Sequence, residues 1–216
     1  MTWDRLRSSY DTVAGVYEAT FIDELAGKPA DRERLAAFAA AVGDPVLDLG
    51  CGPGQIGLAV LDHGRRVLGV DLSPEMARLA AGRLGGAAAG DLRALPVRTG
   101  SVGGVVAFYS LIHLRRSELA QGWAEIARVL RPGGRALVTA HEGSGVVEVD
   151  DFLGRGVPFV ATLMTRDELV AAASGAGLEV VTADRRDPYP SEHPTVRLMI
   201  EAVRPSLPDR PVLCAG

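Results

Sequence analysis

The sequence predicts an α/β protein, a single-domain, three-layer sandwich built around a mostly parallel sheet. From residue 46 onward, short apolar runs rich in β-branched residues alternate with longer segments of helical pattern, which is typical of repeated βα units. The chain has 216 residues, of which 47% are apolar and 23% charged. This length suits one domain, and the composition supports a core without disulfides or structural metal.

Glycine, serine and proline mark the borders of the first βα units. The first helix should end near Gly64, because glycine favours the left-handed conformation that follows a helix. Ser73-Pro74-Glu75 supplies an N-cap, a proline at the first helical position and an early acid. The expected elements are a strand over 46–50, a helix over 55–62, a strand over 67–70, a helix over 74–83 and a weak strand over 87–89.

The same alternation continues through the second half of the chain. Ser117 is expected to cap a helix that stops before Pro132-Gly133-Gly134, and Thr165 with Glu168 predicts a capping box. Residues 142–165 show little regular period, so we expect an excursion over the sheet edge that lines the substrate pocket. The other expected elements are a strand over 104–109, a helix over 117–130, a strand over 135–140, a helix over 165–174 and strands over 178–183 and 196–203.

Residues 1–40 are expected to form a helical cap, and residues 41–216 the main domain. Apolar Leu35, Phe38 and Val42 are spaced for one face of a helix. Such a helix could cover one end of the sheet.

Charge and cysteine content exclude several classes of protein. The formal net charge is −4, and the arginines are scattered among acids, so no basic stripe for nucleic acid is expected. Cys51 and Cys214 lie far apart in the sequence, which predicts neither a disulfide nor a metal site. We find no signal peptide and no apolar run long enough for a bilayer. These features predict a cytoplasmic protein with no membrane partner.

The turn Gly50-Cys51-Gly52-Pro53-Gly54 follows the first predicted strand, where open α/β sheets bind ligands. Glycine lets the backbone approach a ligand without a Cβ clash. Gln55 stands where a dinucleotide fingerprint needs a small residue, and no P-loop lysine follows. The turn is therefore either a tight strand-to-helix corner or a site for another kind of ligand.

Asp48, Asp71 and Asp91 lie in or just after three successive predicted strands. A carboxylate at Asp71 can accept hydrogen bonds from both hydroxyls of a ribose, and one at Asp91 can accept from an adenine amino group. Each acid alone could equally be a helix cap or a surface residue. Together they favour a nucleoside site.

In these motifs the sequence resembles the class I S-adenosylmethionine-dependent methyltransferases that act on small molecules. The resemblance rests on residues 46–54, 69–76, 90–92, 113–114 and 126–134. It implies a Rossmann-like, seven-stranded sheet in the order 3-2-1-4-5-7-6 with the last strand antiparallel. It also implies S-adenosylmethionine as cofactor and S-adenosylhomocysteine as product.

The resemblance further implies residue roles in cofactor binding. The glycine-rich turn would hold the methionyl part, Asp71 the ribose, and Leu72 and Met76 would flank the adenine. The segment 10–17 resembles the N-terminal segment that many small-molecule members fold over the cofactor, although its aromatics could equally anchor an amphipathic helix. The residues expected at the cofactor are Tyr10, Asp48, Gly50, Cys51, Gly52, Gly54, Asp71, Leu72, Met76, Asp91, Leu92 and Phe108.

The candidate catalytic residues are His113 and Tyr17. A histidine titrates near neutral pH and suits a general base, but His113 could instead line the pocket. His141 is a second candidate, with a solvated loop residue as the alternative. Further residues either converge on the substrate or form exposed ion pairs, namely Asp150, Asp151, Arg185, Arg186, Tyr189 and His193.

The predicted acceptor is a small molecule, bound by a monomer or a homodimer. The loop Ser110-Leu111-Ile112-His113 lacks the Asn/Asp-Pro-Pro-Tyr/Phe motif of family members that methylate nitrogens of nucleic acid or protein. Two alternatives stay open. The same site could run a non-methylating reaction, or the chain could be a non-catalytic cofactor-binding or partner protein.

Overall fold

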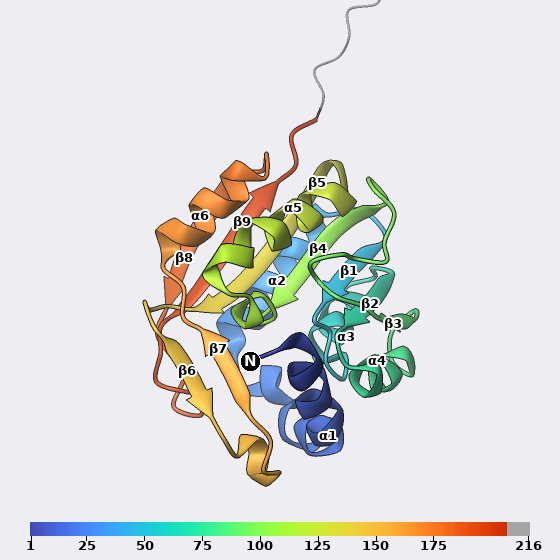
Figure 1. Cartoon of the computed structure of the whole chain (residues 1–216). Coiled ribbons are helices and arrows are strands. Elements are labelled where there is room, and N and C mark those ends of the chain that lie inside the picture. The colour runs from blue at the N-terminus through green and yellow to red at the C-terminus, as the bar shows by residue number, and fades with distance from the viewer. Residues whose placement is uncertain (207–216) are drawn as a thin grey trace, which may run out of the picture.

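The fold is built on a seven-stranded sheet in the order β3-β2-β1-β4-β5-β9-β8 (Figure 1). The computed structural model describes residues 1–206, so Cys214 lies outside the described residues. The predicted strand order is confirmed, and the strand that is last in the chain runs antiparallel to both of its neighbours. The strands are β1 (Val46–Leu49), β2 (Val67–Asp71), β3 (Ala87–Ala89), β4 (Val102–Phe108), β5 (Leu130–His141), β8 (Glu179–Arg186) and β9 (Arg197–Val203).

Helices cover both faces of the sheet and complete the three layers. One face carries α5 (Leu119–Val129) and α6 (Arg166–Gly175), and the other carries α2 (Pro29–Ala41), α3 (Gln55–Leu61) and α4 (Pro74–Ala81). Successive strand residues point to opposite faces, so Leu47 and Leu49 join the core under α5, whereas Val46 joins the core under α2. No helix in residues 1–206 is long and apolar enough to cross a membrane.

Two of the three predicted helix caps are present. The Ser73 hydroxyl accepts a hydrogen bond from a backbone N–H of α4 at 3.1 Å. Thr165 and Glu168 form the reciprocal capping box of α6, at 3.2 and 2.7 Å. The cap predicted at Ser117 is wrong, because this residue lies inside the 3₁₀ turn η3 (Arg116–Glu118), and α5 starts after it without a side-chain cap.

The strand β5 begins at Leu130, earlier than the expected residue 135. The reason is pairing with the chain that follows β9. The Gly133 N–H donates to the Arg204 carbonyl at 2.7 Å, and the Arg204 N–H donates to the Gly134 carbonyl at 2.8 Å. These bonds include the expected turn in the strand, where Gly133 keeps a positive φ of +79° and the pairing with β4 is irregular.

The first 40 residues divide between two positions in the fold. Helix α1 (Trp3–Phe21) lies outside the sandwich, next to α4 (Figure 1), and packs Val13 and Ala14 with Met76 of α4. Helix α2 belongs to one of the layers, where Leu35 and Phe38 are buried.

Residues 142–165 form a β-hairpin rather than an irregular excursion. Strands β6 (Val146–Val149) and β7 (Phe159–Thr162) pair antiparallel in a separate two-stranded sheet (Figure 1). The short 3₁₀ turn η4 (Phe152–Gly154) lies between them and packs against α1. The hairpin thus brings this segment beside the N-terminal helix.

Candidate functional site

A cavity lies at the carboxyl ends of β1, β2 and β4, and α1 covers it. Its empty volume, counted together with the solvent-open space at its mouth, is about 600 Å³. The predicted site residues on its wall are Tyr10, Tyr17, Gly50, Gly52, Asp71, Leu72, Met76, Leu92, Phe108 and His113. The structure therefore brings together residues that are as far apart in the sequence as α1 and the loop after β4.

The turn after β1 exposes backbone to this cavity because its glycines adopt positive φ. Gly50 has a φ of +70°, and a Cβ there would lie 2.3 Å from the Cβ of Ser110, so no side chain fits. Gly52 has a φ of +51°, and a Cβ there would lie 3.8 Å from the Tyr17 ring. A larger side chain at Gly52 would consequently fill space between the turn and α1.

Asp71 ends β2 and presents a buried carboxylate on the cavity wall. Its oxygens accept the backbone N–H groups of Gly52 and Ser73, each at 2.8 Å. Burial raises the pKa of Asp71 to about 6, although these two hydrogen bonds favour the charged form. At neutral pH the cavity therefore contains a fixed carboxylate.

Apolar side chains line the remainder of the strand ends. Leu72 and Met76 follow β2, Leu92 follows β3, and Phe108 ends β4. They form an apolar wall next to the carboxylate of Asp71. A flat apolar group joined to a polar hydroxylated ring matches this distribution of lining groups.

Three predicted site residues support the turn instead of lining the cavity. The buried Asp48 carboxylate accepts the N–H of Gly57 in α3 at 2.8 Å, and burial raises its pKa to about 7. Gly54 (φ +99°) caps α3 and packs on Ala80. Cys51 is buried in the core between the sheet and α2, α3 and α4, and burial raises the pKa of its thiol.

Asp91 is also absent from the cavity wall. Both of its oxygens bind the Arg93 guanidinium, at 2.6 to 3.1 Å, and this pairing lowers its pKa. Arg93 in turn donates to Glu118 at 2.9 Å and stacks over the Trp3 ring at 4.0 Å. The acid that was expected at an adenine therefore forms part of an ion-pair cluster that holds the start of α1.

His113 and Tyr10 form a hydrogen-bonded pair on the cavity wall. The His113 Nδ1 lies 2.9 Å from the carbonyl of Val160 in β7, and Nε2 lies 2.8 Å from the Tyr10 hydroxyl. A carbonyl oxygen only accepts, so Nδ1 carries the proton, and Nε2 accepts from Tyr10. Burial lowers the pKa of His113 to about 4 and raises that of Tyr10. The pair is neutral at pH 7, and Nε2 has the lone pair that a proton acceptor needs.

Tyr17 lies about two helical turns beyond Tyr10 on α1, between Tyr10 and Phe21. Its ring meets Tyr10 edge-on, with centroids 6.1 Å apart, and contacts Phe21 at 4.5 Å. Burial is the main cause that raises its pKa. Its hydroxyl therefore stays protonated over the physiological range and can donate a hydrogen bond.

Seven residues of the cavity wall were not predicted as site residues: Trp3, Leu6, Leu49, Val70, Gly90, Tyr109 and Ser110. Tyr109 directly follows β4 and has a φ of +55°, which is unusual for a residue with a side chain. Its position after a buried strand was a usable signal, as was that of Ser110. Trp3 and Leu6 gave none, because their place depends on how α1 docks.

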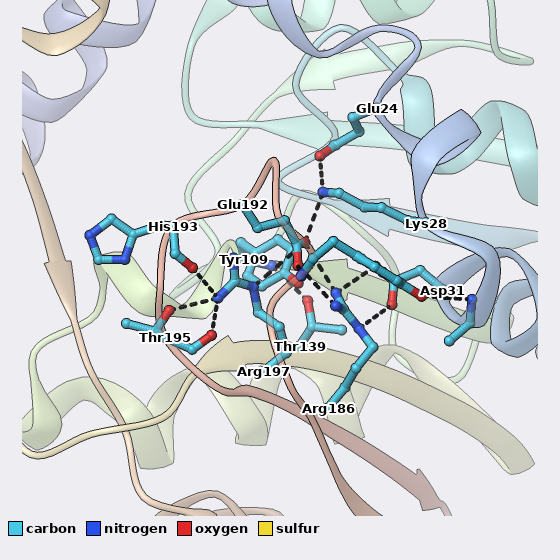
Figure 2. Close-up of polar contacts among 12 residues, drawn as sticks. Glu24, Lys28, Asp31, Tyr109, Thr139, Arg186, Glu192, His193, Thr195 and Arg197 are labelled. Atoms are coloured by element: carbon cyan, nitrogen blue, oxygen red, sulfur yellow. Dashed lines mark hydrogen bonds and ion pairs between the residues drawn. The ribbon is translucent and has the colours of Figure 1, made fainter.

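Arg186, which was expected either at the substrate or in an ion pair, lies in an ion-pair network beside β8 (Figure 2). Arg186 binds the buried Asp31 of α2 at 3.0 Å and Glu192 at 2.9 Å. Lys28 also binds Glu192, at 3.2 Å. Tyr189 stacks under the Arg186 guanidinium at 4.3 Å. This network ties the loop between β8 and β9 to the start of α2.

The remaining candidates also lie off the cofactor cavity. His141 stacks on Tyr109, with centroids 4.9 Å apart, and its Nδ1 lies 2.7 Å from the Thr195 hydroxyl. Arg185 pairs with Glu142 at 2.6 Å. The residues that are exposed are Asp150, Asp151 and His193. Within residues 1–206, no cluster of three or more His, Cys, Asp and Glu side chains could hold a metal ion.

The fold and the cavity together define a Rossmann-like methyltransferase domain. A family model described as "Methyltransferase domain" matches residues 46–134. The chain is 28% identical over 212 residues to a malonyl-[acyl-carrier protein] O-methyltransferase of Herminiimonas arsenicoxydans, covering 94% of this chain and 75% of that protein. Residues 46–134 therefore match a methyltransferase domain, and the chain has the Rossmann-like methyltransferase fold.

Two further relatives show how far this likeness extends. A 1,6-didemethyltoxoflavin-N1-methyltransferase of Burkholderia thailandensis, solved with its substrate and S-adenosylhomocysteine, has a TM-score of 0.72 at 25% identity, covering 94% of this chain and 88% of that one. A 37.1 kDa protein of transposon TN4556 from Streptomyces fradiae is 38% identical over 134 residues, or 56% of this chain. The chain spans only 38% of the length of that protein.

Proposed function

We propose that the protein is an S-adenosylmethionine-dependent methyltransferase that acts on a small-molecule acceptor. One observation carries the proposal: the buried carboxylate of Asp71 lies on the wall of a cavity beside Gly50 and Gly52, which present bare backbone to it. Each Asp71 oxygen accepts one N–H, so each keeps a lone-pair site for a ribose hydroxyl. The residues present therefore fit the nucleoside part of the cofactor.

The other wall residues fit the remaining parts of the cofactor. Leu72 and Met76 would flank the adenine ring, and the open backbone at Gly50 and Gly52 would hold the methionyl part. When bound, the cofactor supplies a methyl group on a sulfonium that is already activated for displacement. The protein then has to align the acceptor and exclude water. Helix α1, which covers the cavity, serves the second purpose.

His113 and Tyr10 are placed to handle a proton from the acceptor. Because Nδ1 is committed to the Val160 carbonyl, only Nε2 can accept a proton, directly or through the Tyr10 hydroxyl. Acceptance by Nε2 would give a buried cation, and burial already disfavours that form. This arrangement suits an acceptor that loses its proton during methyl transfer rather than before it.

Calorimetric titration with S-adenosylmethionine and S-adenosylhomocysteine tests the proposal, with Gly52→Val as the variant. We expect micromolar binding of both ligands to the wild type and none to Gly52→Val. Gly64→Val is the matched control, since Gly64 also has positive φ but has open space around its Cβ position. If both variants lose binding equally, the loss is caused by backbone strain and not by a side chain that blocks the ligand site. Absence of binding to the folded wild type would refute the proposal.

A further inference from the structure

A second cavity adjoins the cofactor cavity. Its empty volume is about 800 Å³, and Trp3, Leu6 and His113 line both cavities. The first turn of α1, the loop after β4 and the β6–β7 hairpin form its walls. A molecule bound there would therefore reach the same imidazole that faces the cofactor cavity.

The hairpin turns one face to this cavity. Val146 pairs with Thr162 and Glu148 pairs with Val160 across the two strands, and all four line the cavity. The alternate residues pack against the main core instead, namely Val147, Phe159 and Ala161. This period-two division gives the cavity one wall of aliphatic side chains with a carboxylate among them.

Four charged side chains line the cavity: Arg115, Arg116, Glu118 and Glu148. Two of them are paired with residues outside it. Arg116 donates to Glu168 at 2.7 Å, and Glu118 accepts from Arg93 at 2.9 Å. These two charges are therefore already compensated within the protein.

The other two charges have no partner of opposite sign within residues 1–206. The Arg115 guanidinium contacts only the Met1 carbonyl, at 3.5 Å, and the Glu148 side chain makes no hydrogen bond or ion pair in the same part of the chain. Because they lie on different walls and form no ion pair with each other, the cavity presents one free positive and one free negative group. Both are exposed to solvent.

We propose that this second cavity binds the methyl acceptor and that the acceptor is a zwitterion of the amino-acid class. Its carboxylate pairs with Arg115 and its ammonium with Glu148, while its apolar body lies along Leu6, Val146 and Val160. The reactive group then points to the shared residue His113. This proposal rests on the proposed function, because the acceptor must approach a cofactor in the first cavity.

Three probes that share a phenol ring test the charge assignment. L-Tyrosine has both charges, tyramine has only the ammonium, and 3-(4-hydroxyphenyl)propionate has only the carboxylate. Each is titrated by calorimetry into the full chain saturated with S-adenosylhomocysteine. We expect L-tyrosine to bind about fivefold more tightly than either analogue, which is the scale of one partly exposed ion pair.

Charge-neutral variants assign each ion pair to a residue. Arg115→Gln should lower the affinity for L-tyrosine and for the propionate by about fivefold and leave the affinity for tyramine unchanged. Glu148→Gln should lower the affinity for L-tyrosine and for tyramine and leave the affinity for the propionate unchanged. Arg98→Gln is the matched control, because this exposed arginine precedes β4 at the opposite end of the sheet. It should change none of the affinities.

The outcomes separate the two proposals. If S-adenosylhomocysteine binds and no probe does, the second cavity is not the acceptor site. If an analogue with one charge binds as tightly as L-tyrosine, the zwitterion assignment is wrong. If S-adenosylhomocysteine itself does not bind the wild type, the proposed function fails first.

Discussion

Replacing Asp71 with alanine should weaken cofactor binding by a predictable amount. Its carboxylate lies on the cavity wall, fixed by the N–H groups of Gly52 and Ser73 at 2.8 Å. A hydrogen bond to a charged group contributes about 1.5–3 kcal/mol. At about 1.4 kcal/mol per tenfold change, the affinity for S-adenosylhomocysteine should fall by about 10- to 140-fold, as measured by calorimetry.

The same substitution should also lower the stability of the ligand-free protein. It leaves two backbone N–H groups without their acceptor, and a buried donor left unsatisfied costs about 1–3 kcal/mol. Water can enter the cavity and bind these groups, so we expect the low end, about 2 kcal/mol in total. Urea denaturation of the ligand-free variant measures this loss and shows that the binding experiment is made on folded protein.

Asp48→Asn is the control for this experiment. Asp48 lies in the adjacent strand and is buried, but it serves the N-terminus of α3 and does not line the cavity. Its replacement should leave the affinity for S-adenosylhomocysteine within about twofold, since no hydrogen bond to the ligand is lost. An affinity of folded Asp71→Ala within twofold of the wild type would refute the ribose assignment.

Two further predictions concern pH and turnover. Burial raises the pKa of Asp48 to about 7, above the value near 4 in an unfolded chain, so this group contributes stability below pH 4 that is lost as the pH rises through 7. The free energy of unfolding of Asp48→Asn, relative to the wild type, should therefore rise between pH 5 and pH 8 in urea titrations, and a constant difference would contradict this. His113→Ala should lower turnover by about 10²- to 10⁴-fold while cofactor affinity is preserved. A loss under tenfold in an assay of S-adenosylhomocysteine release would leave His113 as a lining residue.

The sequence predicted the sheet well because local signals and tertiary structure agree there. The caps at Ser73 and Thr165 and the glycine turn after β1 are determined by neighbouring residues. The hairpin was missed because its short valine-rich strands are separated by glycines and acids that weaken the pattern. Its strands pair with each other, and the turn η4 between them contacts α1; no local pattern encodes these contacts.

The residues of the site that lie at strand ends could be predicted from the sequence. Those whose place depends on how α1 packs against the sheet could not. Gly50, Gly52 and Asp71 follow β1 and β2 directly, so sheet topology alone places them at one edge. Asp91 occupies an equivalent position after β3, but Arg93 two residues later captures its carboxylate. Strand order alone does not reveal this ion pair, and the role of Asp91 in cofactor binding stays a prediction.

His113 connects the two segments that lie outside the repeating βα core. Its Nε2 is bound by Tyr10 of α1 and its Nδ1 by Val160 of the hairpin. Because Tyr10 lies on α1 and on the wall of the cavity, a displacement of α1 would break the bond between Tyr10 and His113. The bond to Val160 would remain and keep the imidazole in the same tautomer. The sheet therefore positions Gly50, Gly52 and Asp71, whereas α1 and the hairpin together determine the tautomer of His113, the residue that we propose meets the acceptor.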